Sequence, residues 1–359
     1  MLKSLKIRNF RCFEEFDLPQ LGRINLLVGK NNGGKTSILE AVHILNSPDS
    51  IKSFLDIIES RGEYFQSSND NYRFGFEANH FLHGHSSAGD NFNVSGMSDE
   101  ARYNMFSFLL TSASIRELEL AAKRENRSFE NAGISLQTVE LNYTMRWDIG
   151  SHKSLLCLPS NMSISQVTAK NIPSKISRFV PVNFSDVYTI IEDFNQIVLT
   201  PQEETLYEAL RIIEPGIERI APVTTQGYGS AGFVVSINKQ RVPIGSMGYG
   251  IWRILEITLA MVNIPGGTLL IDEIDTGLHF SVMIDLWKLI CKTAEKLDIQ
   301  VFATTHNSDC WKSLAEVANS DDIASDDITI HRIERDKKAS IVFNEQEMAI
   351  AAERDIEVR

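Results

Sequence analysis

Long apolar runs are missing from this sequence of 359 residues, and no stretch approaches the roughly 18 consecutive apolar residues of a membrane-spanning helix. The first ten residues, MLKSLKIRNF, lack the apolar segment of a secretory signal peptide, so nothing indicates export. The four cysteines have no CxxC spacing and no paired histidines nearby, which argues against a disulfide framework and against a zinc site. We therefore expect a cytoplasmic protein with reduced thiols and no membrane partner.

Internal repeats, sustained heptads and low-complexity tracts are missing too, which excludes a long coiled-coil arm. Basic charge is scarce, and the formal net charge is -12. Such a chain is not a general nucleic-acid coat, because phosphate binding needs clustered Lys and Arg. Two local basic groups remain, and a solvated surface is the simpler interpretation of each. They are Lys3, Lys6, Arg8 and Arg11, and Lys123, Arg124 and Arg127.

Short apolar runs typical of buried strands alternate with helical apolar patterns along much of the chain. The strand-like runs lie at 24–28, 268–271, 299–304, 328–335 and 340–344, and the helical patterns at 35–45, 251–262, 281–296 and 346–354. This alternation indicates an α/β fold with a mostly parallel sheet flanked by helices on both faces.

The part of the chain between about residues 50 and 240 has weaker patterns. Residues 109–127 have a helical pattern, and residues 138–147 alternate as in a strand. At Thr200-Pro201 we expect a helix to begin, with the threonine as its cap and the proline at its first position.

The segment from Gly29 to Thr36, GKNNGGKT, fits the phosphate-binding pattern G-x-x-x-x-G-K-[ST] in full. It lies between an expected strand and an expected helix, and this context makes a chance glycine-rich turn the poorer interpretation. Glycines let backbone N–H groups point at phosphates, and the helix adds the positive end of its dipole. Lys35 would contact the β- and γ-phosphates, and the Thr36 hydroxyl would bind Mg²⁺. The expected ATP contacts are Gly29, Asn31, Asn32, Gly33, Gly34, Lys35, Thr36 and Ser37.

Two adjacent acids, Asp272 and Glu273, end the apolar run at 268–271. A buried parallel strand places its last residues at the carboxyl edge of the sheet, beside the phosphate loop. There Asp272 can hold Mg²⁺, and Glu273 can orient or deprotonate the attacking water. An acidic helix cap is the alternative, and the phosphate loop upstream favours the catalytic interpretation.

Three further short motifs occur in a consistent order. Ser246-Met247-Gly248 precedes a helical pattern, Asp275 to His279 (DTGLH) follows the acids, and His306 follows a buried strand. Each is weak alone, because a Ser-x-Gly is usually a turn and a histidine at a strand end is usually structural. Together with the phosphate loop and the acids, they resemble the head of an ABC-type ATPase.

This resemblance implies a role for each motif. Ser246 and Gly248 would form the signature loop, which meets the γ-phosphate bound by an opposite subunit. Asp275 would lie in the D-loop at the dimer interface, and His306 would be the switch histidine. Lys35, Glu273 and His306 are then the catalytic set, and ATP and Mg²⁺ are the implied ligands.

Within this class the sequence is similar to the OLD-like (overcoming-lysogenisation-defect) and RecF/SMC-like ATPases, through residues 7–13, 29–32 and 272–279. The resemblance implies a P-loop NTPase head of the ABC type, with a mixed or parallel sheet flanked by helices. Residues 1–60 and 240–359 would form this head. Residues 61–239 match no motif and would form an inserted arm or lid of helices and strands, together with some strands of the head.

Several positions depart from the family pattern. Gly33 stands where serine is frequent, and Met247 where glycine or aspartate is common. Gln66 is the best-placed residue for a Q-loop, although a surface loop residue is the simpler interpretation. Three residues could lie near the adenine, and core packing is the simpler expectation for the two aromatic ones. They are Phe10, Arg11 and Phe13.

The favoured hypothesis is a homodimeric or higher-order ATPase that closes on ATP and controls a separately encoded effector such as a nuclease, in anti-phage defence or DNA surveillance. No cluster of acids near the end of the chain resembles the Toprim nuclease of full-length OLD proteins. A RecF- or SMC-like DNA-repair protein is the alternative, against which the net charge and the missing coiled coil count. A transporter subunit would need a recognisable Q-loop, and a non-hydrolysing protein would not need the whole motif set.

Overall fold

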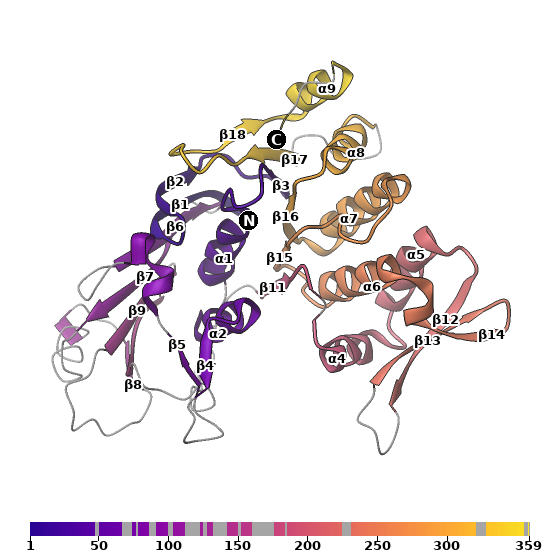
Figure 1. Ribbon diagram of the computed structural model, residues 1–359, viewed down its shortest axis with the longest axis horizontal. Coiled ribbons are helices and arrows are strands. Elements are labelled where there is room, and N and C mark those ends of the chain that lie inside the picture. Colours follow the sequence, from indigo (N-terminus) through magenta and orange to yellow (C-terminus); the bar gives the residue numbers. More distant parts are fainter. Residues whose placement is uncertain are drawn as a thin grey trace. The chain divides into compact units, whose positions relative to one another are not determined.

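The computed structural model describes residues 1–46, 50–66, 74–76, 78–85, 91–99, 103–111, 123–124, 128–131, 142–149, 152–159, 176–183, 185–224, 231–320, 328–354 and 358 (Figure 1). The chain divides into two compact units. The first unit comprises Met1–Leu21, Asn32–Lys175 and Ile333–Ser340, and the second comprises Gly22–Asn31, Ile176–Arg332 and Ile341–Arg359. The chain therefore passes from one unit to the other inside the glycine-rich loop.

This division follows different lines from the head and insertion expected from the sequence. Residues 176–239 group with the second unit, and residues 32–60 group with 61–175 in the first. That residues 61–239 act as an arm or lid stays a prediction.

The first unit contains a seven-stranded sheet in the order β2-β1-β6-β7-β9-β10-β8. Neighbouring strands pair antiparallel, except β8, which pairs parallel with β10. The strands are β1 (Leu2–Phe10), β2 (Phe13–Leu18), β6 (Asn91–Ser98), β7 (Tyr103–Thr111), β8 (Ser128–Asn131), β9 (Asn142–Ile149) and β10 (His152–Pro159). A separate antiparallel pair consists of β4 (Tyr64–Gln66) and β5 (Phe74–Phe76).

Helix α1 (Lys35–Asn46) packs against β1, β6 and β7 of this sheet, and α2 (Ser50–Arg61) packs against α1. The expected apolar residues of α1, Ile38, Leu39, Val42 and Leu45, are all buried. Two short 3-10 turns, η1 (Ala78–Phe81) and η2 (His83–His85), follow β5.

The second unit is built on a six-stranded sheet in the order β11-β15-β16-β3-β17-β18. The strands are β3 (Ile24–Val28), β11 (Ser177–Val180), β15 (Thr268–Ile271), β16 (Gln300–Thr305), β17 (Ile328–Arg332) and β18 (Ile341–Phe343). The first five strands in this order run parallel, and β18 pairs antiparallel with β17. Every residue of β3, β15 and β16 is buried, as their continuous apolar runs predict.

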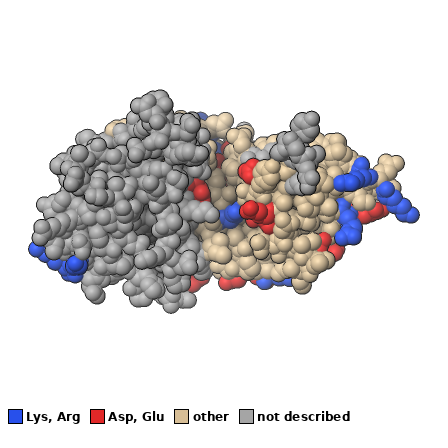
Figure 2. All heavy atoms as spheres, turned by 90° about the horizontal axis from the view of Figure 1, so that it is seen from below, with Lys and Arg blue, Asp and Glu red and all other residues tan. Residues whose placement is uncertain are grey.

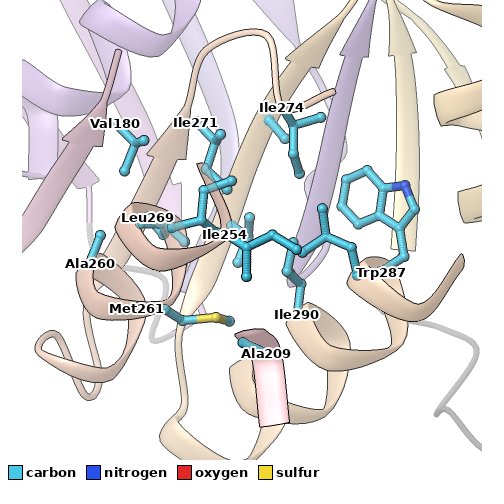
Figure 3. Close-up of a cluster of buried hydrophobic side chains, with 14 of the residues drawn as sticks. Val180, Ala209, Ile254, Ala260, Met261, Leu269, Ile271, Ile274, Trp287 and Ile290 are labelled. Atoms are coloured by element: carbon cyan, nitrogen blue, oxygen red, sulfur yellow. The ribbon is translucent and has the colours of Figure 1, made fainter. Parts of the chain in front are cut away.

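Helices cover this sheet and supply its hydrophobic core. They are α4 (Val187–Ile197), α5 (Gln202–Ile213), α6 (Tyr249–Val262), α7 (Met283–Leu297), α8 (Ser308–Ala318) and α9 (Glu345–Glu353). Figure 1 shows α6, α7 and α8 following one another along one side of the strands, and α7 contacts both of its neighbours. Figure 3 shows Ile254 and Met261 of α6 beside Leu269 of β15 and Ile290 of α7, all of which are buried.

A small antiparallel sheet of three strands, β12 (Ile217–Thr224), β13 (Ala231–Ile237) and β14 (Gln240–Pro243), completes the second unit. Its strand β14 leads directly into a 3-10 turn, η4 (Ile244–Met247), and then into α6. Another 3-10 turn, η5 (Phe280–Val282), precedes α7. Among the described residues, no helix combines the length and apolar character that crossing a membrane requires.

The α/β class, the parallel core strands and their helices are confirmed, and two local expectations are wrong. Leu109 to Thr111 continue strand β7 instead of starting a helix, and residues 112–122 and 125–127 of that expected helix lie outside the described residues. Thr200 does not cap α5, because its hydroxyl donates to the carbonyl of Ile197 at the end of α4. Pro201 is the cap residue of α5, and it makes no side-chain hydrogen bond.

A network of buried polar side chains links neighbouring strands of the core sheet. Asn25 of β3 donates to the carbonyls of Gly22 and Val301, and its Oδ1 accepts the Gly22 N–H. The Thr329 hydroxyl also donates to this Oδ1, so the Nε2 of His331, 3.1 Å from the hydroxyl, must donate to it. This arrangement requires a proton on Nε2 of His331.

His331 makes the stability of the fold depend on pH. Burial lowers the pKa of His331 from 6.5 to about 3. Below pH 6.5 the unfolded chain therefore binds one proton more than the folded chain. As the pH is lowered through this range, the free energy of unfolding decreases by about 1.4 kcal/mol per pH unit. His331→Gln keeps a donor for Thr329 and removes this dependence. Denaturant titrations at pH 7.5 and 5.0 should show the wild type losing about 2 kcal/mol relative to the variant. If the wild type and the variant lost the same free energy of unfolding between pH 7.5 and 5.0, His331 would not be the source of the pH dependence.

Candidate functional site

The two acids after β15 lie next to the end of β16, as the parallel register requires. Ile271 pairs with Ala303, so Asp272 and Glu273 come beside the residues that end β16. The hydroxyl of Thr304 donates to Asp272 Oδ1 at 2.6 Å and accepts the N–H of Glu273 at 2.8 Å. Thr304 is fully buried, and it therefore fixes both acids by one side chain in the interior.

Glu273 and His306 form a direct pair at this edge of the sheet. His306 Nδ1 lies 2.6 Å from Glu273 Oε2, and because a carboxylate has only acceptors, the histidine donates. The side chain of His306 is 52% exposed and that of Glu273 is 20% exposed. The pair thus faces solvent, while the backbone beneath it is held by buried groups.

The residues after Glu273 are tied to the same edge. The hydroxyl of Thr305 donates to Asp275 Oδ1 at 2.6 Å and accepts the N–H of Asn307 at 3.0 Å. The N–H of Ile274 donates to the carbonyl of Thr304. Two neighbouring threonines of β16 therefore position three acids, Asp272, Glu273 and Asp275.

The glycine-rich loop leaves β3 at this same edge. Val28, the last residue of β3, pairs with Thr305 of β16, so Gly29 follows directly beside the end of β16. Gly29 has a φ of 148°, and Asn31 is exposed. The structure brings the start of the loop, the acids and His306 to one edge of the sheet in the second unit.

The remainder of the loop belongs to the first unit. Gly34 has a φ of +98°, and a Cβ there would lie 2.3 Å from Phe13 Cζ and 2.7 Å from Cys12 Sγ. Only glycine fits this position. Lys35 begins α1 and is 5% exposed, and Ser37 is buried. Asn32, Gly33 and Thr36 complete this part of the loop, in which Asn32 is exposed and Gly33 and Thr36 are partly buried.

The candidate signature residues lie on the surface of the second unit. Ser246 is in η4, and Gly248, with a φ of +89°, directly precedes α6. Both residues are exposed. The ring of Tyr249 packs so closely on Gly277 that a Cβ at Gly277 would lie 2.2 Å from Tyr249 Cδ1. The start of α6 therefore contacts the segment that follows Asp275, and the structure shows no contact of Ser246 with the acids.

The three residues considered for the adenine, Phe10, Arg11 and Phe13, are packed against other residues of the protein and are not open to a ligand. Phe10 and Phe13 are buried, as core packing predicts. Arg11 Nε donates to Glu40 Oε2 of α1 at 3.1 Å, and its Nη1 donates to Glu63 Oε1 at 2.7 Å. Its guanidinium also lies 4.1 Å from the centre of the Phe81 ring. Gln66 ends β4, and its side chain lies outside the described residues.

The ion cluster of Arg11 is buried against the helix that follows the phosphate loop. Glu40 accepts from both Arg11 and Arg61 and is only 2% exposed. Burial raises the pKa of Glu40, while Arg11 and Arg61 favour its charged form. Arg11 therefore joins β1 to α1 through an internal ion pair.

Sequence reasoning missed the groups that hold the acids. Thr304 and Thr305 were given no role, although two polar residues at the end of a buried strand, directly before His306, were a usable signal. Arg253 of α6 was missed altogether, because one arginine in an apolar helical pattern usually faces solvent. In the structure it is fully buried.

Comparison with known proteins identifies the family of the chain. Residues 24–309 match the model of a family described as "AAA domain, putative AbiEii toxin, Type IV TA system". The chain belongs to this AAA family. It is an ABC-type ATPase head similar to OLD and RecF proteins, and nucleotide binding and hydrolysis are general properties of such heads.

Relatives of this AAA protein include an ATP/GTP phosphatase of Helicobacter pylori, which is 24% identical over 90% of each chain. An OLD nuclease of Thermus scotoductus is 24% identical over 86% of this chain, and the match spans 59% of the nuclease. A RecF protein of Chlamydia caviae is 25% identical over 58% of each chain. Among solved structures, an SMC head bound to the winged-helix domain of ScpA aligns over 96% of this chain and 98% of its own, with a TM-score of 0.48 and 11% identity.

The requirement for glycine at position 34 can be tested by two matched substitutions. Gly34→Ala adds a Cβ both at a positive φ and against the ring of Phe13, whereas Gly62→Ala adds one at a φ of +64° with nothing within 4 Å. We expect Gly62→Ala to cost roughly 1 kcal/mol from backbone strain alone. Gly34→Ala should cost about 2 kcal/mol or more and weaken ATP binding, because Phe13 and the loop must move. Thermal melts and titration with a fluorescent ATP analogue measure both effects, and equal behaviour of the two variants would contradict the close packing.

Proposed function

We propose that this protein binds and hydrolyses ATP, and that two copies close head to head on the nucleotide to control a separate effector. The observation that carries the proposal is the Glu273–His306 pair, at the sheet edge where the glycine-rich loop begins. A carboxylate held by a histidine and open to solvent is suited to orient a water molecule and to accept its proton. Lys35 supplies a cation for the β- and γ-phosphates.

The hydroxyl of Thr36 and the carboxylate of Asp272, which follows β15, are the oxygen groups that Mg²⁺ prefers. Mg²⁺ prefers oxygen ligands and keeps several waters, so one hydroxyl, one carboxylate and the nucleotide phosphates suffice. Thr36 and Asp272 would supply the hydroxyl and the carboxylate. Among the described residues, no group of three or more His, Cys, Asp or Glu side chains could hold a metal alone. When bound, the ion neutralises charge on the phosphates, and Thr304 keeps Asp272 oriented for it.

The exposed position of the signature residues supports a dimer. Ser246 and Gly248 face solvent at the start of a helix of 14 residues. Backbone N–H groups at such a start attract anions, so this surface is suited to a phosphate presented by a second copy. Asp275, in the segment packed against Tyr249, would lie at the same interface. ATP would thus join the loop of one chain to the Ser246 turn of its twin.

The biological role that we propose is anti-phage defence, with a separately encoded effector such as a nuclease. This step rests on the similarity to the OLD nuclease, of which the match spans 59%.

A trapped dimer is the direct test of ATP-driven closure. Glu273→Gln keeps the shape of the side chain and removes the proton acceptor, so ATP should bind without being hydrolysed. We expect the variant with ATP and Mg²⁺ to run at twice the monomer mass in size exclusion with light scattering, and its turnover to fall by about 100-fold or more. Adding Lys35→Ala to this variant should restore the monomer, because phosphate binding is lost. A Glu273→Gln protein that binds ATP and stays monomeric would rule out the closure mechanism.

A RecF-like DNA-binding function is the second candidate, because a RecF protein of Clostridioides difficile is 44% identical over 55 residues. Charge argues against it. In the N-terminal basic group, Lys3 pairs with Asp99, Arg8 with Glu15 and Asp17, and Arg11 with Glu40 and Glu63. On the face drawn in Figure 2, the described Lys and Arg residues lie in small separate groups, and acids lie near those on the right.

Salt dependence separates the two candidates. Proteins that bind DNA through several phosphate contacts lose about 10³-fold or more in affinity between 50 and 200 mM salt. We expect Glu273→Gln, with ATP, to retain little duplex DNA in filter-binding titrations at any salt concentration. Strong ATP-dependent retention with a steep salt slope would instead support the DNA-repair function.

A further inference from the structure

A buried arginine joins helix α6 to the turn that carries the acids. Arg253 Nη2 donates to the carbonyl of Asp272 at 2.5 Å and to that of Glu273 at 3.2 Å. Its Nη1 donates to the carbonyl of Pro181, which follows β11, at 2.6 Å. One planar guanidinium therefore binds the ends of two neighbouring strands through three main-chain oxygens.

The burial of this charge is costly, which argues against packing as its only role. Arg253 is 0% exposed, and its Nε has no hydrogen-bond partner. Burial lowers the pKa of Arg253, and the nearby carboxylate of Glu256, 3.8 Å away, opposes this effect. An apolar side chain of similar length would fill the same space without desolvating a cation. What such a side chain could not do is hold three carbonyl groups.

The carbonyls that Arg253 holds belong to a turn with an unusual backbone. Glu273 has a φ of 48°, in the left-handed region that non-glycine residues rarely occupy. A residue persists there only when its surroundings fix it, here the Thr304 hydroxyl on its N–H and Arg253 on its carbonyl. This conformation directs the Glu273 carboxylate to His306.

We propose that Arg253 is a positioning residue, whose guanidinium fixes the main chain at Asp272 and Glu273 so that the Glu273 carboxylate meets His306. This inference rests on the proposed hydrolysis of ATP, in which Glu273 handles the attacking water. Arg253 itself contacts neither water nor nucleotide in this role. It acts through the turn, and it does so from the helix that begins at the signature residues.

Kinetics of two substitutions test the role. Arg253→Ala removes all three hydrogen bonds, and Arg253→Lys can replace only some of them because an ammonium lacks the planar fork. We expect kcat to fall by about 100-fold in Arg253→Ala, since small misplacements of a reacting group have effects of this size, while KM for ATP changes little. Guanidinium chloride at tens of millimolar should restore part of kcat in Arg253→Ala, and sodium chloride should not. Thr258→Val is the matched control, because Thr258 is buried in the same helix and its Oγ1 has no partner.

A measurement that needs no hydrolysis separates this inference from the proposed function. In protein labelled with ¹⁵N-histidine, the His306 Nδ1–H bonded to a carboxylate gives a distinct resonance, which Glu273→Gln identifies by perturbing it. We expect Arg253→Ala to perturb this resonance in the same way, and guanidinium to restore it. If the wild type hydrolyses no ATP but the His306 resonance depends on Arg253, the proposed ATPase function is wrong and the positioning role of Arg253 stands. An unperturbed resonance, or a loss of kcat that guanidinium cannot restore and that Thr258→Val reproduces, would overturn the positioning role.

Discussion

Parallel pairing of β3, β15 and β16 positions the groups of the candidate site in the second unit. The three strands run in one direction, so the loop after β3, the acids after β15 and the histidine after β16 lie at one edge. The register then decides the finer geometry, because it places Thr304 where one hydroxyl can serve both Asp272 and Glu273. A shift of one residue in β16 would turn this hydroxyl to the opposite face of the sheet. The burial of all three strands holds that register.

Polar groups at the two ends of this sheet differ in kind. Near the beginnings of the strands, Asn25, Thr329 and His331 form an uncharged network whose hydrogen bonds tie strand to strand. At the strand ends, charged groups face solvent and are held from beneath by threonines and by Arg253. The left-handed backbone of Glu273 is held at that edge by the Thr304 hydroxyl on its N–H and by Arg253 on its carbonyl.

Much of the second unit could be predicted from the sequence, for a physical reason. The short, mostly apolar runs at 268–271 and 299–304 alternate with helical patterns, which favours buried strands, and acids or a histidine directly after such strands lie at the strand ends. The predictions that were wrong rested on local patterns that the position of a buried strand does not constrain. Leu109 to Thr111 continue an apolar strand, and a short apolar run has no period that separates a strand from a helix. Thr200 precedes Pro201 as a cap would, yet its hydroxyl bonds the end of the previous helix.

The side chains that hold the site were harder to predict than the site itself. Thr304 and Arg253 act through hydrogen bonds to main-chain atoms of residues far away in the chain. Such contacts depend on the packing of α6 and β16 against β15, which no local pattern encodes. The available signals were the position of Thr304 at the end of a buried strand and the charge of Arg253 within an apolar helical pattern.

The left-handed backbone of Glu273 lowers the stability of the fold, although the proposed hydrolysis needs a glutamate at this position. Glycine or asparagine would adopt a φ of 48° with less strain, and the difference for glutamate is roughly 1 kcal/mol. Variants chosen for heat resistance alone would therefore tend to replace this glutamate and discard the carboxylate beside His306. Thermostable versions of the chain are better sought at positions remote from this turn.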